Sequence, residues 1–443
     1  MADTGRARSA ARMNAQCCGQ CTTHGAEMTM QTLVSQSARL DGLFSRRAQK
    51  VSSAPLLQGM DKVGQRISFI FGFPDPASLP AAEVAAMTTQ VLSQRGEAAL
   101  QYGDNAGYSG LIDALIAKLA RDQGIRANRE NILITAGGSQ AIDLLLDTLV
   151  DWGDTIVSEM PTWLGAVQAF QNVGADIISI PIDNGGIDVG VLDRELRRLR
   201  DKDITPKFIY ANANFQNPTG ATMSSQRRAD LLALARSAGT VLIEDDAYFD
   251  LRYDGESIPS IYSMDTSNSV VYMGTLSKTM GPGMRLGWLV GPPELIRRVS
   301  ALKVDGGTNV FGAHVAADWL PENLLPHVGR LREVYHRRRD LMLAALEQHM
   351  PPGSTWSVPE GGFFVWLTLP EDIDTTRMLA QVQELGVEYL PGPTCYADRA
   401  GSNQLRLSYS FVTDELIEPG IRIIGDVIRA ELSEARSDVR SRF

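Results

Sequence analysis

Short apolar runs and amphipathic segments alternate along the chain from about residue 130 onward. The apolar runs are typical of buried strands, and the segments between them carry apolar residues at helical spacing, as at positions 142, 145, 146 and 149. We predict strands at 132–136, 155–159, 176–180, 207–211, 240–244 and 270–274, and helices that include 164–172, 192–200 and 226–237. Such alternation favours an α/β fold in which a mostly parallel sheet lies between helices and ligands bind beyond the carboxyl ends of its strands.

The pattern changes after Arg297. A long, largely helical stretch reaches to about Met350, where Pro351, Pro352 and Gly353 end it. The remainder of the chain predicts strands at 363–369 and 404–410 and helices at 376–385 and 414–435. We therefore expect a second, smaller α+β unit.

Composition narrows the classes of function that the chain can have. Its 443 residues include 42 Lys and Arg against 52 Asp and Glu, and this net charge of −10 disfavours nucleic acid or an anionic membrane as the main partner. No apolar run approaches the ~20 residues that cross a bilayer. Only five His are present, and none lies in a motif suited to a catalytic triad or a zinc site, so we expect chemistry by Lys, Tyr, Asp and Arg.

The first 30 residues contain three of the four cysteines. Cys18, Cys21 and His24 have metal-like spacing, but no second ligand pair follows, so we predict a flexible tail with incidental thiols and no metal site. No apolar segment typical of a signal peptide follows the early arginines, so secretion is not expected. Together with the unpaired Cys395, this cysteine usage favours a reducing, cytoplasmic setting.

Polar motifs follow three of the predicted strands. Residues 137–140 (Gly-Gly-Ser-Gln) lie where a strand passes into a helix, and the free N–H groups of a helix N-terminus bind anions. Residues 217–220 (Asn-Pro-Thr-Gly) and 245–248 (Asp-Asp-Ala-Tyr) follow two further strands. Taken alone, the first two motifs are more typical of ordinary turns, and the third is as typical of a solvated acidic turn as of a site.

The strongest segment runs from Thr275 to Trp288. It places Thr275, Ser277 and Lys278 at the end of strand 270–274, and a Gly-Pro-Gly bend and Arg285 come next. The ordinary alternative is a surface lysine, which the apolar flanks of Lys278 disfavour.

In this order, these segments resemble the fold-type I, pyridoxal-phosphate-dependent enzymes of the class I/II aminotransferase family. The likeness is greatest to the branch that contains 2-aminoadipate and kynurenine aminotransferases and the catalytic domains of related transcription regulators. It extends from about Ile67 through Arg422, and further family-like stretches are 102–107, 332–340, 359–366 and 405–409.

The resemblance implies a large domain with a mostly parallel, seven-stranded sheet between helices and a smaller α+β domain. It divides the chain into an N-terminal extension (1–45), flexible in part, and an arm (46–80) that contributes to the small domain and the substrate entrance. The large domain (81–310), which binds the cofactor, and the small C-terminal domain (311–443) follow.

The resemblance also implies roles for single residues. Lys278 would form the Schiff base with the aldehyde of pyridoxal 5'-phosphate and then move a proton as general base and acid. Asp245 would pair with the ring nitrogen, and Asn217 and Tyr248 would bind the phenolic oxygen. The groups implied to bind the phosphate are Gly138, Ser139, Gln140, Thr275, Ser277, Arg285 and, from the other subunit of a homodimer, Tyr102.

Arg406 matches the arginine that binds the α-carboxylate of the substrate, where a planar guanidinium suits two-point recognition. Asn217, Phe71 and Gly72 would also contact the substrate. Two positions depart from the family pattern. Trp163 stands where a tyrosine usually stacks on the cofactor ring, and Phe71 with Gly72 replaces a usual pair of glycines, which would reshape the substrate entrance.

We therefore expect an aminotransferase of amino-acid metabolism and biosynthesis that moves an α-amino group from an L-amino acid to a 2-oxo acid. The alternative is an enzyme of the same fold that catalyses β- or γ-elimination, replacement or carbon–carbon bond formation in specialised metabolism. A non-catalytic or regulatory protein is the least favoured class. Lys278, Asp245 and Arg285 are all present, the net charge is acidic, and no winged-helix segment precedes the region of likeness.

Overall fold

The structure, a computed structural model, describes residues 42–50 and 66–441. The chain divides into two compact units, Met1–Ser53 and Ala54–Phe443. In the first unit, the described residues include a short exposed helix, α2 (Arg46–Lys50). Cys18, Cys21 and His24 lie outside the described residues, so the predicted tail with incidental thiols stays a prediction. Everything below concerns the second unit.

The central sheet of this unit has eight strands in the order β2-β9-β8-β7-β6-β3-β4-β5. The strands are β2 (Ile132–Thr135), β3 (Thr155–Met160), β4 (Asp176–Asp183), β5 (Gly186–Ile187), β6 (Phe208–Asn212), β7 (Val241–Asp245), β8 (Val270–Thr275) and β9 (Gly287–Val290). The five strands from β8 to β4 in this order are parallel, and β9 runs antiparallel between β2 and β8. The predicted mostly parallel sheet is confirmed.

Two strands differ from the expectation. Strand β9, which completes the seven strands implied by the resemblance, is not among the predicted strands, although residues 286–290 (Leu-Gly-Trp-Leu-Val) form a short apolar run. Strand β5 is an eighth strand that pairs antiparallel with the end of β4. It has only two residues, so it is too short to leave a periodic signal in the sequence.

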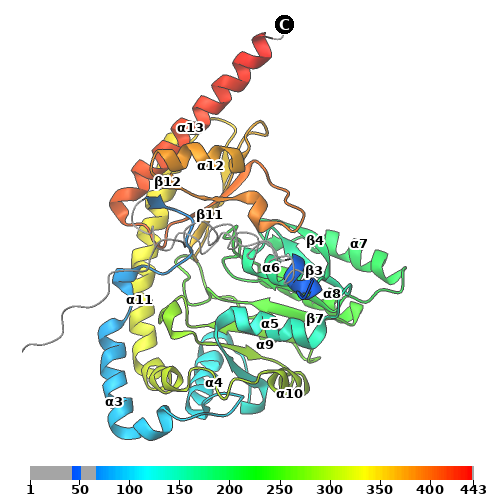
Figure 1. Ribbon diagram of the computed structural model, residues 1–443, viewed down its shortest axis with the longest axis vertical. Coiled ribbons are helices and arrows are strands. Elements are labelled where there is room, and N and C mark those ends of the chain that lie inside the picture. Colours follow the sequence, from blue (N-terminus) through cyan, green and yellow to red (C-terminus); the bar gives the residue numbers. More distant parts are fainter. Residues whose placement is uncertain (1–41, 51–65, 442–443) are drawn as a thin grey trace, which may run out of the picture. The chain divides into compact units, whose positions relative to one another are not determined.

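Helices cover both faces of the sheet (Figure 1). One face is covered by α5 (Gly137–Leu149), α6 (Leu164–Asn172) and α10 (Pro293–Leu302). The other is covered by α7 (Val189–Arg200), α8 (Ser225–Ala238), α9 (Ile261–Met264), α3 (Ala81–Ala99), α4 (Ser109–Gln123) and the first half of α11 (Val310–His349). Local chemistry sets several helix ends, since Asp188 and Ser224 cap the starts of α7 and α8, and Gly239 ends α8 with a φ of 66°.

A second core surrounds a four-stranded antiparallel sheet of order β10-β11-β14-β13. Its elements are β10 (Thr355–Trp356), β11 (Phe364–Thr368), β13 (Leu390–Pro391), β14 (Gln404–Ser408), α12 (Thr375–Glu384) and α13 (Asp414–Ser441). The early strand β1 (Ile67–Ser68) pairs in parallel with β12 (Val387–Glu388), so the segment around residue 70 joins this part of the unit. The predicted smaller α+β unit is confirmed.

Helix α11 belongs to both cores, and Figure 1 shows it running along the large sheet toward α13. Its residues up to Val328 pack in the core that contains α3 and α4, and those from Leu331 pack in the second core. The long helical stretch predicted after Arg297 is interrupted between α10 and α11, where Asn309 adopts a φ of 37° and caps α11. The predicted domain boundaries stay predictions. Among the described residues, no helix is long and apolar enough to cross a membrane.

Candidate active site

The parallel sheet brings the polar motifs to one edge. Asp245 ends β7, Thr275 ends β8, and Asn217 and Trp163 lie in the loops after β6 and β3. Because parallel strands end at the same edge of a sheet, these loops meet there although they come from distant parts of the chain. Arg406 reaches the same place from β14, in the second core.

Lys278 is half-buried at this edge. Its Nζ donates a hydrogen bond to the backbone carbonyl of Gly72 at 3.0 Å and lies 5.6 Å from the centre of the Tyr248 ring. Burial, helped by the charge of Arg406, lowers the pKa of the Lys278 ammonium to about 8, while Asp245 works in the opposite direction. A lowered pKa leaves more of the amine neutral near pH 7, the form that attacks a carbonyl carbon.

Asp245 is 9% exposed and accepts a hydrogen bond from the hydroxyl of Tyr210. Burial raises the pKa of this carboxyl to about 6, and the charge of Lys278 counteracts the rise. A positive ring nitrogen beside Asp245 would favour the ionised carboxylate in the same way.

The neighbouring Asp246 faces a different set of partners. Asn214 and Gln123 donate to its carboxylate through their side-chain amides, at 3.0 and 3.2 Å, and Tyr272 donates through its hydroxyl at 3.3 Å. Asp246 therefore serves the interior of the large domain, and Asp245 is the carboxylate that neighbours Lys278.

Arg406 is 4% exposed and belongs to a ring of buried polar contacts. Its guanidinium donates to the side-chain oxygen of Asn217 at 2.9 Å and to the backbone carbonyl of Ile70, and its Cζ lies 4.1 Å from the centre of the Phe364 ring. Its Nε has no hydrogen-bond partner, and no acidic side chain of the described residues pairs with it. A buried guanidinium without a counter-charge is a strong site for a carboxylate.

Tyr248 lies between Lys278 and Asn217, the partner of Arg406. The Tyr248 side chain is hydrogen-bonded to Asn217, and burial raises the pKa of its hydroxyl above its usual range. Its ring packs edge-on against Phe363 and Phe364, at centroid distances of 5.3 and 5.8 Å. The phenol is therefore neutral near pH 7 and offers one hydrogen-bond donor.

The groups expected to bind a phosphate surround the start of α5. Arg285, in a left-handed conformation with a φ of 46°, lies against Gly137 and donates to the carbonyl of Ala136 at 2.6 Å. A Cβ added to Gly138 would meet nothing within 4 Å, so this turn borders open space. The hydroxyls of Thr275 and Ser277 lie 2.9 Å apart.

This set of donors fits pyridoxal phosphate. A guanidinium, a helix N-terminus and two hydroxyls suit its phosphate, the carboxylate of Asp245 suits its ring nitrogen, and the amine of Lys278 suits its aldehyde. The remaining predicted phosphate ligands differ in their surroundings. Ser139 is exposed, and Gln140 accepts a hydrogen bond from the backbone N–H of Ala136 and so caps the helix. Tyr102 is 84% exposed.

The residues that depart from the family pattern, Trp163 and Phe71 with Gly72, each contact an identifiable neighbour. Trp163 precedes α6 and its indole lies over Gly165. A Cβ on Gly72 would come within 2.6 Å of the Phe364 ring, so a larger residue at this position would have to displace that ring. The ring of Phe71 stacks on Phe73, with centroids 4.9 Å apart.

Sequence reasoning missed two side chains of this site. Phe364 lies under the Arg406 guanidinium, and Tyr210 holds Asp245. Tyr210 could have been found, because it lies two residues before Asn212, the last residue of β6. Successive side chains of a strand point to opposite faces, so Tyr210 and Asn212 share one face of the sheet at its carboxyl edge. Phe364 had no such signal, because its partner lies on a different strand of the second core.

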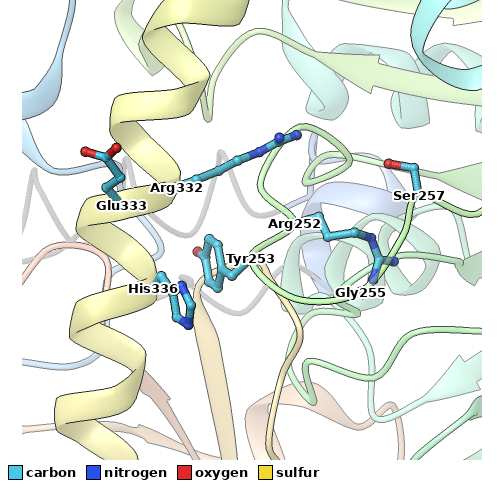
Figure 2. A pocket seen from close by; sticks show the side chains of 7 residues that line it. All are labelled: Arg252, Tyr253, Gly255, Ser257, Arg332, Glu333 and His336. Atoms are coloured by element: carbon cyan, nitrogen blue, oxygen red, sulfur yellow. The ribbon is translucent and has the colours of Figure 1, made fainter.

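A separate cavity of about 290 Å³ lies between the loop after β7 and helix α11 (Figure 2). Arg252 lines it from the loop and Arg332 from the helix, as Figure 2 shows, and none of the predicted site residues lines it. Arg252 pairs with Glu360, and Arg332 donates through its Nε to the backbone carbonyl of Asp250. We assign no role to this cavity.

Residues 72–424 match the protein family described as "Aminotransferase class I and II". The chain is 37% identical over 396 residues to the aromatic-amino-acid aminotransferase 1 of Thermococcus litoralis, across 88% of this chain and 95% of that protein. It is 32% identical over 398 residues to the 2-aminoadipate transaminase of Thermus thermophilus, across 88% and 97%.

A solved structure is equally similar. The kynurenine aminotransferase of Pyrococcus horikoshii, crystallised "in complex with PMP, KYN as substrates and KYA as products", superposes with a TM-score of 0.86 at 36% identity, across 90% of this chain and 99% of that chain. The predicted fold type, enzyme class and cofactor are thereby confirmed. The chain belongs to the class I and II aminotransferase family and is a pyridoxal-phosphate-dependent aminotransferase of fold type I.

Proposed function

We propose that the pocket around Lys278 moves an α-amino group from an L-amino acid to a 2-oxo acid, and that Arg406 binds the α-carboxylate of both. The observation that carries this assignment is the buried Arg406 guanidinium, which has no acidic partner among the described residues and lowers the pKa of the nearby Lys278 ammonium. A carboxylate bound to Arg406 would supply the missing negative charge and hold the α-carbon near Lys278.

When bound, pyridoxal phosphate supplies an aldehyde that condenses with amines and a ring that withdraws electrons. Lys278 provides the amine that holds this aldehyde, and its freed Nζ then takes a proton from the substrate Cα and passes it on as general base and acid. Asp245 places a negative charge at the ring nitrogen. Asn217 and Tyr248 bind the ring oxygen, and Arg285 with the start of α5 binds the phosphate.

We also propose that the preferred donor has a large aromatic or apolar side chain. Phe71, Phe73 and Phe411 form a partly exposed aromatic cluster, with the edge-on contacts of Phe411 at 5.9 and 6.0 Å. This cluster flanks Gly72, the contact of Lys278. Relatives are named for aromatic amino acids and kynurenine. A pocket contact of this size shifts selectivity by ~1–3 kcal/mol.

A half-reaction tests both proposals. Purified holoenzyme is mixed with single L-amino acids without a 2-oxo acid, and the cofactor absorbance is followed. We expect stoichiometric conversion to the pyridoxamine form, at least roughly tenfold faster with aromatic donors than with alanine. Arg406→Gln is the control, expected to keep the lysine-bound cofactor while losing the reaction with amino acids. Repeated turnover with the aldehyde form regenerated would instead favour elimination, replacement or carbon–carbon bond formation.

We further propose a homodimer with shared active sites, working in the cytoplasm, where the buried thiol of Cys395 stays reduced. Tyr102 is 84% exposed, and Leu100 and Val304 beside it are 72% and 87% exposed. A hydrogen bond from the N–H of Gly103 to the carbonyl of Gly306 joins the two segments. Clustered exposed apolar side chains are typical of a protein–protein interface, and Tyr102 would reach the phosphate of the other subunit.

Complementation tests the shared site. Lys278→Ala and Tyr102→Ala chains are each expected to be impaired, but a mixed dimer would hold one site with both native residues. Random exchange of subunits should therefore restore about a quarter of the wild-type activity. Each variant mixed with itself is the control. A fully active monomer in sedimentation, or no gain on mixing, would contradict the proposal.

A further inference from the structure

We propose that Glu159 and Gln216 form a buried positioning pair that holds the Asn217 turn against the end of β3, and thereby aims Arg406 at the substrate carboxylate. This inference rests on the proposed function, which assigns Arg406 to the substrate carboxylate and Asn217 to the ring oxygen of the cofactor. It concerns two residues that carry none of the roles assigned above.

Glu159 lies near the end of β3 and its side chain is fully buried. Its Oε1 accepts two hydrogen bonds, from the backbone N–H of Asn212 at 2.9 Å and from the Nε2 amide of Gln216 at 3.0 Å. The same amide of Gln216 donates to the carbonyl of Pro161 at 2.8 Å. One side chain thus fastens the loop that follows β6 to the loop that leads to Trp163.

Gln216 also shapes its own turn. Its Oε1 accepts hydrogen bonds from the backbone N–H of Thr219 at 2.9 Å and from the Thr219 hydroxyl at 2.7 Å. Its backbone N–H donates to the carbonyl of Ala221 at 2.9 Å. Asn217 sits at the head of this closed turn, where its oxygen accepts from Arg406 at 2.9 Å. The contacts therefore run without a break from Glu159 to the guanidinium.

Glu159 performs this task as an uncharged acid. Its Oε2 is buried without a hydrogen-bond partner, and no basic side chain of the described residues forms an ion pair with it. Burial raises the pKa of Glu159 to about 8, and the charge of the nearby Asp245 acts in the same direction. A neutral carboxyl can be replaced by an amide, which keeps the accepting oxygen and leaves Asp245 as the charge that faces Lys278.

Glu244 is a matched control for a merely structural buried acid. It is also fully buried, and it accepts two hydrogen bonds of 2.9 Å, from the backbone N–H groups of Ile261 and Tyr262. These bonds hold the start of α9. The aspartate whose charge acts on Glu244 is Asp246, not Asp245. Its loss should destabilise the fold to a similar degree without moving the Asn217 turn.

The test compares Glu159→Gln, Glu159→Ala, Gln216→Ala and Glu244→Ala with the wild-type holoenzyme. Three quantities are measured: the KM and kcat for one amino-acid donor, the hydrogen exchange of the amides of 212–221, and the melting temperature. We expect Glu159→Ala and Gln216→Ala to raise KM roughly tenfold or more, with a smaller change in kcat, because buried partners are left unpaired and the turn shifts. Exchange in 212–221 should rise in both.

Glu159→Gln should restore wild-type KM and exchange, and Glu244→Ala should lower the melting temperature while leaving KM within about twofold. If Glu159→Ala does not fold, Gln216→Ala breaks the same contact from the other side and decides the matter. An unchanged KM in Gln216→Ala, or a Glu159→Gln variant as impaired as Glu159→Ala, would overturn the inference. Failure of the proposed function is a separate result, in which the wild-type enzyme itself does not transaminate.

Discussion

The Lys278→Ala variant is expected to lose the visible absorbance of lysine-bound cofactor and essentially all turnover. Lys278 is the half-buried amine beside Asp245, and burial lowers its pKa to about 8, which makes it both a nucleophile and a proton carrier near neutral pH. Alanine supplies neither function. The measurements are the absorption spectrum of the purified protein, the adduct trapped by borohydride, and kcat with a saturating donor.

Lys118, another lysine of low exposure, provides a control that separates an effect on catalysis from an effect on stability. Lys118 is 4% exposed and pairs with Asp250 at 2.9 Å and Asp122 at 3.3 Å. Lys118→Met should lower the melting temperature, because it leaves the half-buried carboxylate of Asp250 without its ion-pair partner while Asp122 keeps Arg121, and it should keep the cofactor spectrum. A Lys278→Ala enzyme that retained both its borohydride-trapped adduct and its rate would show that another residue holds the cofactor.

The Asp245→Asn variant is expected to lose about a hundred- to a thousand-fold in kcat, the scale of removing one electrostatic contact to a developing charge. Asparagine keeps the size of the side chain and an oxygen that can accept from Tyr210. It removes the negative charge that would keep the ring nitrogen protonated, so the ring withdraws electrons less strongly from the substrate Cα. Single-turnover rates of the half-reaction measure the effect.

Asp246→Asn is the matched control, one residue away. Its carboxylate is bound by Asn214, Gln123 and Tyr272 in the interior, so we expect a loss of stability and less than about a tenfold loss of kcat. If Asp246→Asn were crippled and Asp245→Asn nearly normal, the assignment of the two carboxylates would have to be exchanged.

Much of the fold could be predicted from local pattern alone. Strand β3, predicted at 155–159, spans Thr155–Met160, and helix α6 has the predicted bounds. A buried parallel strand is a continuous apolar run and a covering helix repeats its apolar residues every three to four positions, so both signals are contained in a short window. The motifs at 217–220, 245–248 and 275–288 could be placed on one sheet edge for the same reason, because parallel topology aligns their strand ends.

Elements without such a signal were missed. Strand β5 has two residues, and the break before α11 depends on Asn309 in a left-handed conformation, which no apolar period records. Gln140 also makes a contact that its motif does not indicate. Its side chain accepts a hydrogen bond from the backbone N–H of Ala136 and so caps the start of α5.

Only the tertiary structure decided what surrounds each reactive group. Lys278 contacts the carbonyl of Gly72, 206 residues away, and Arg406 contacts Asn217, 189 residues away. Backbone carbonyls carry no residue-specific signature, and the burial that lowers the pKa of Lys278 and raises that of Asp245 is a property of packed neighbours from both cores. The sequence by itself determined which side chains reach the sheet edge. Their partners, their protonation and the uncompensated charge of Arg406 were decided by the packing of the second core against that edge.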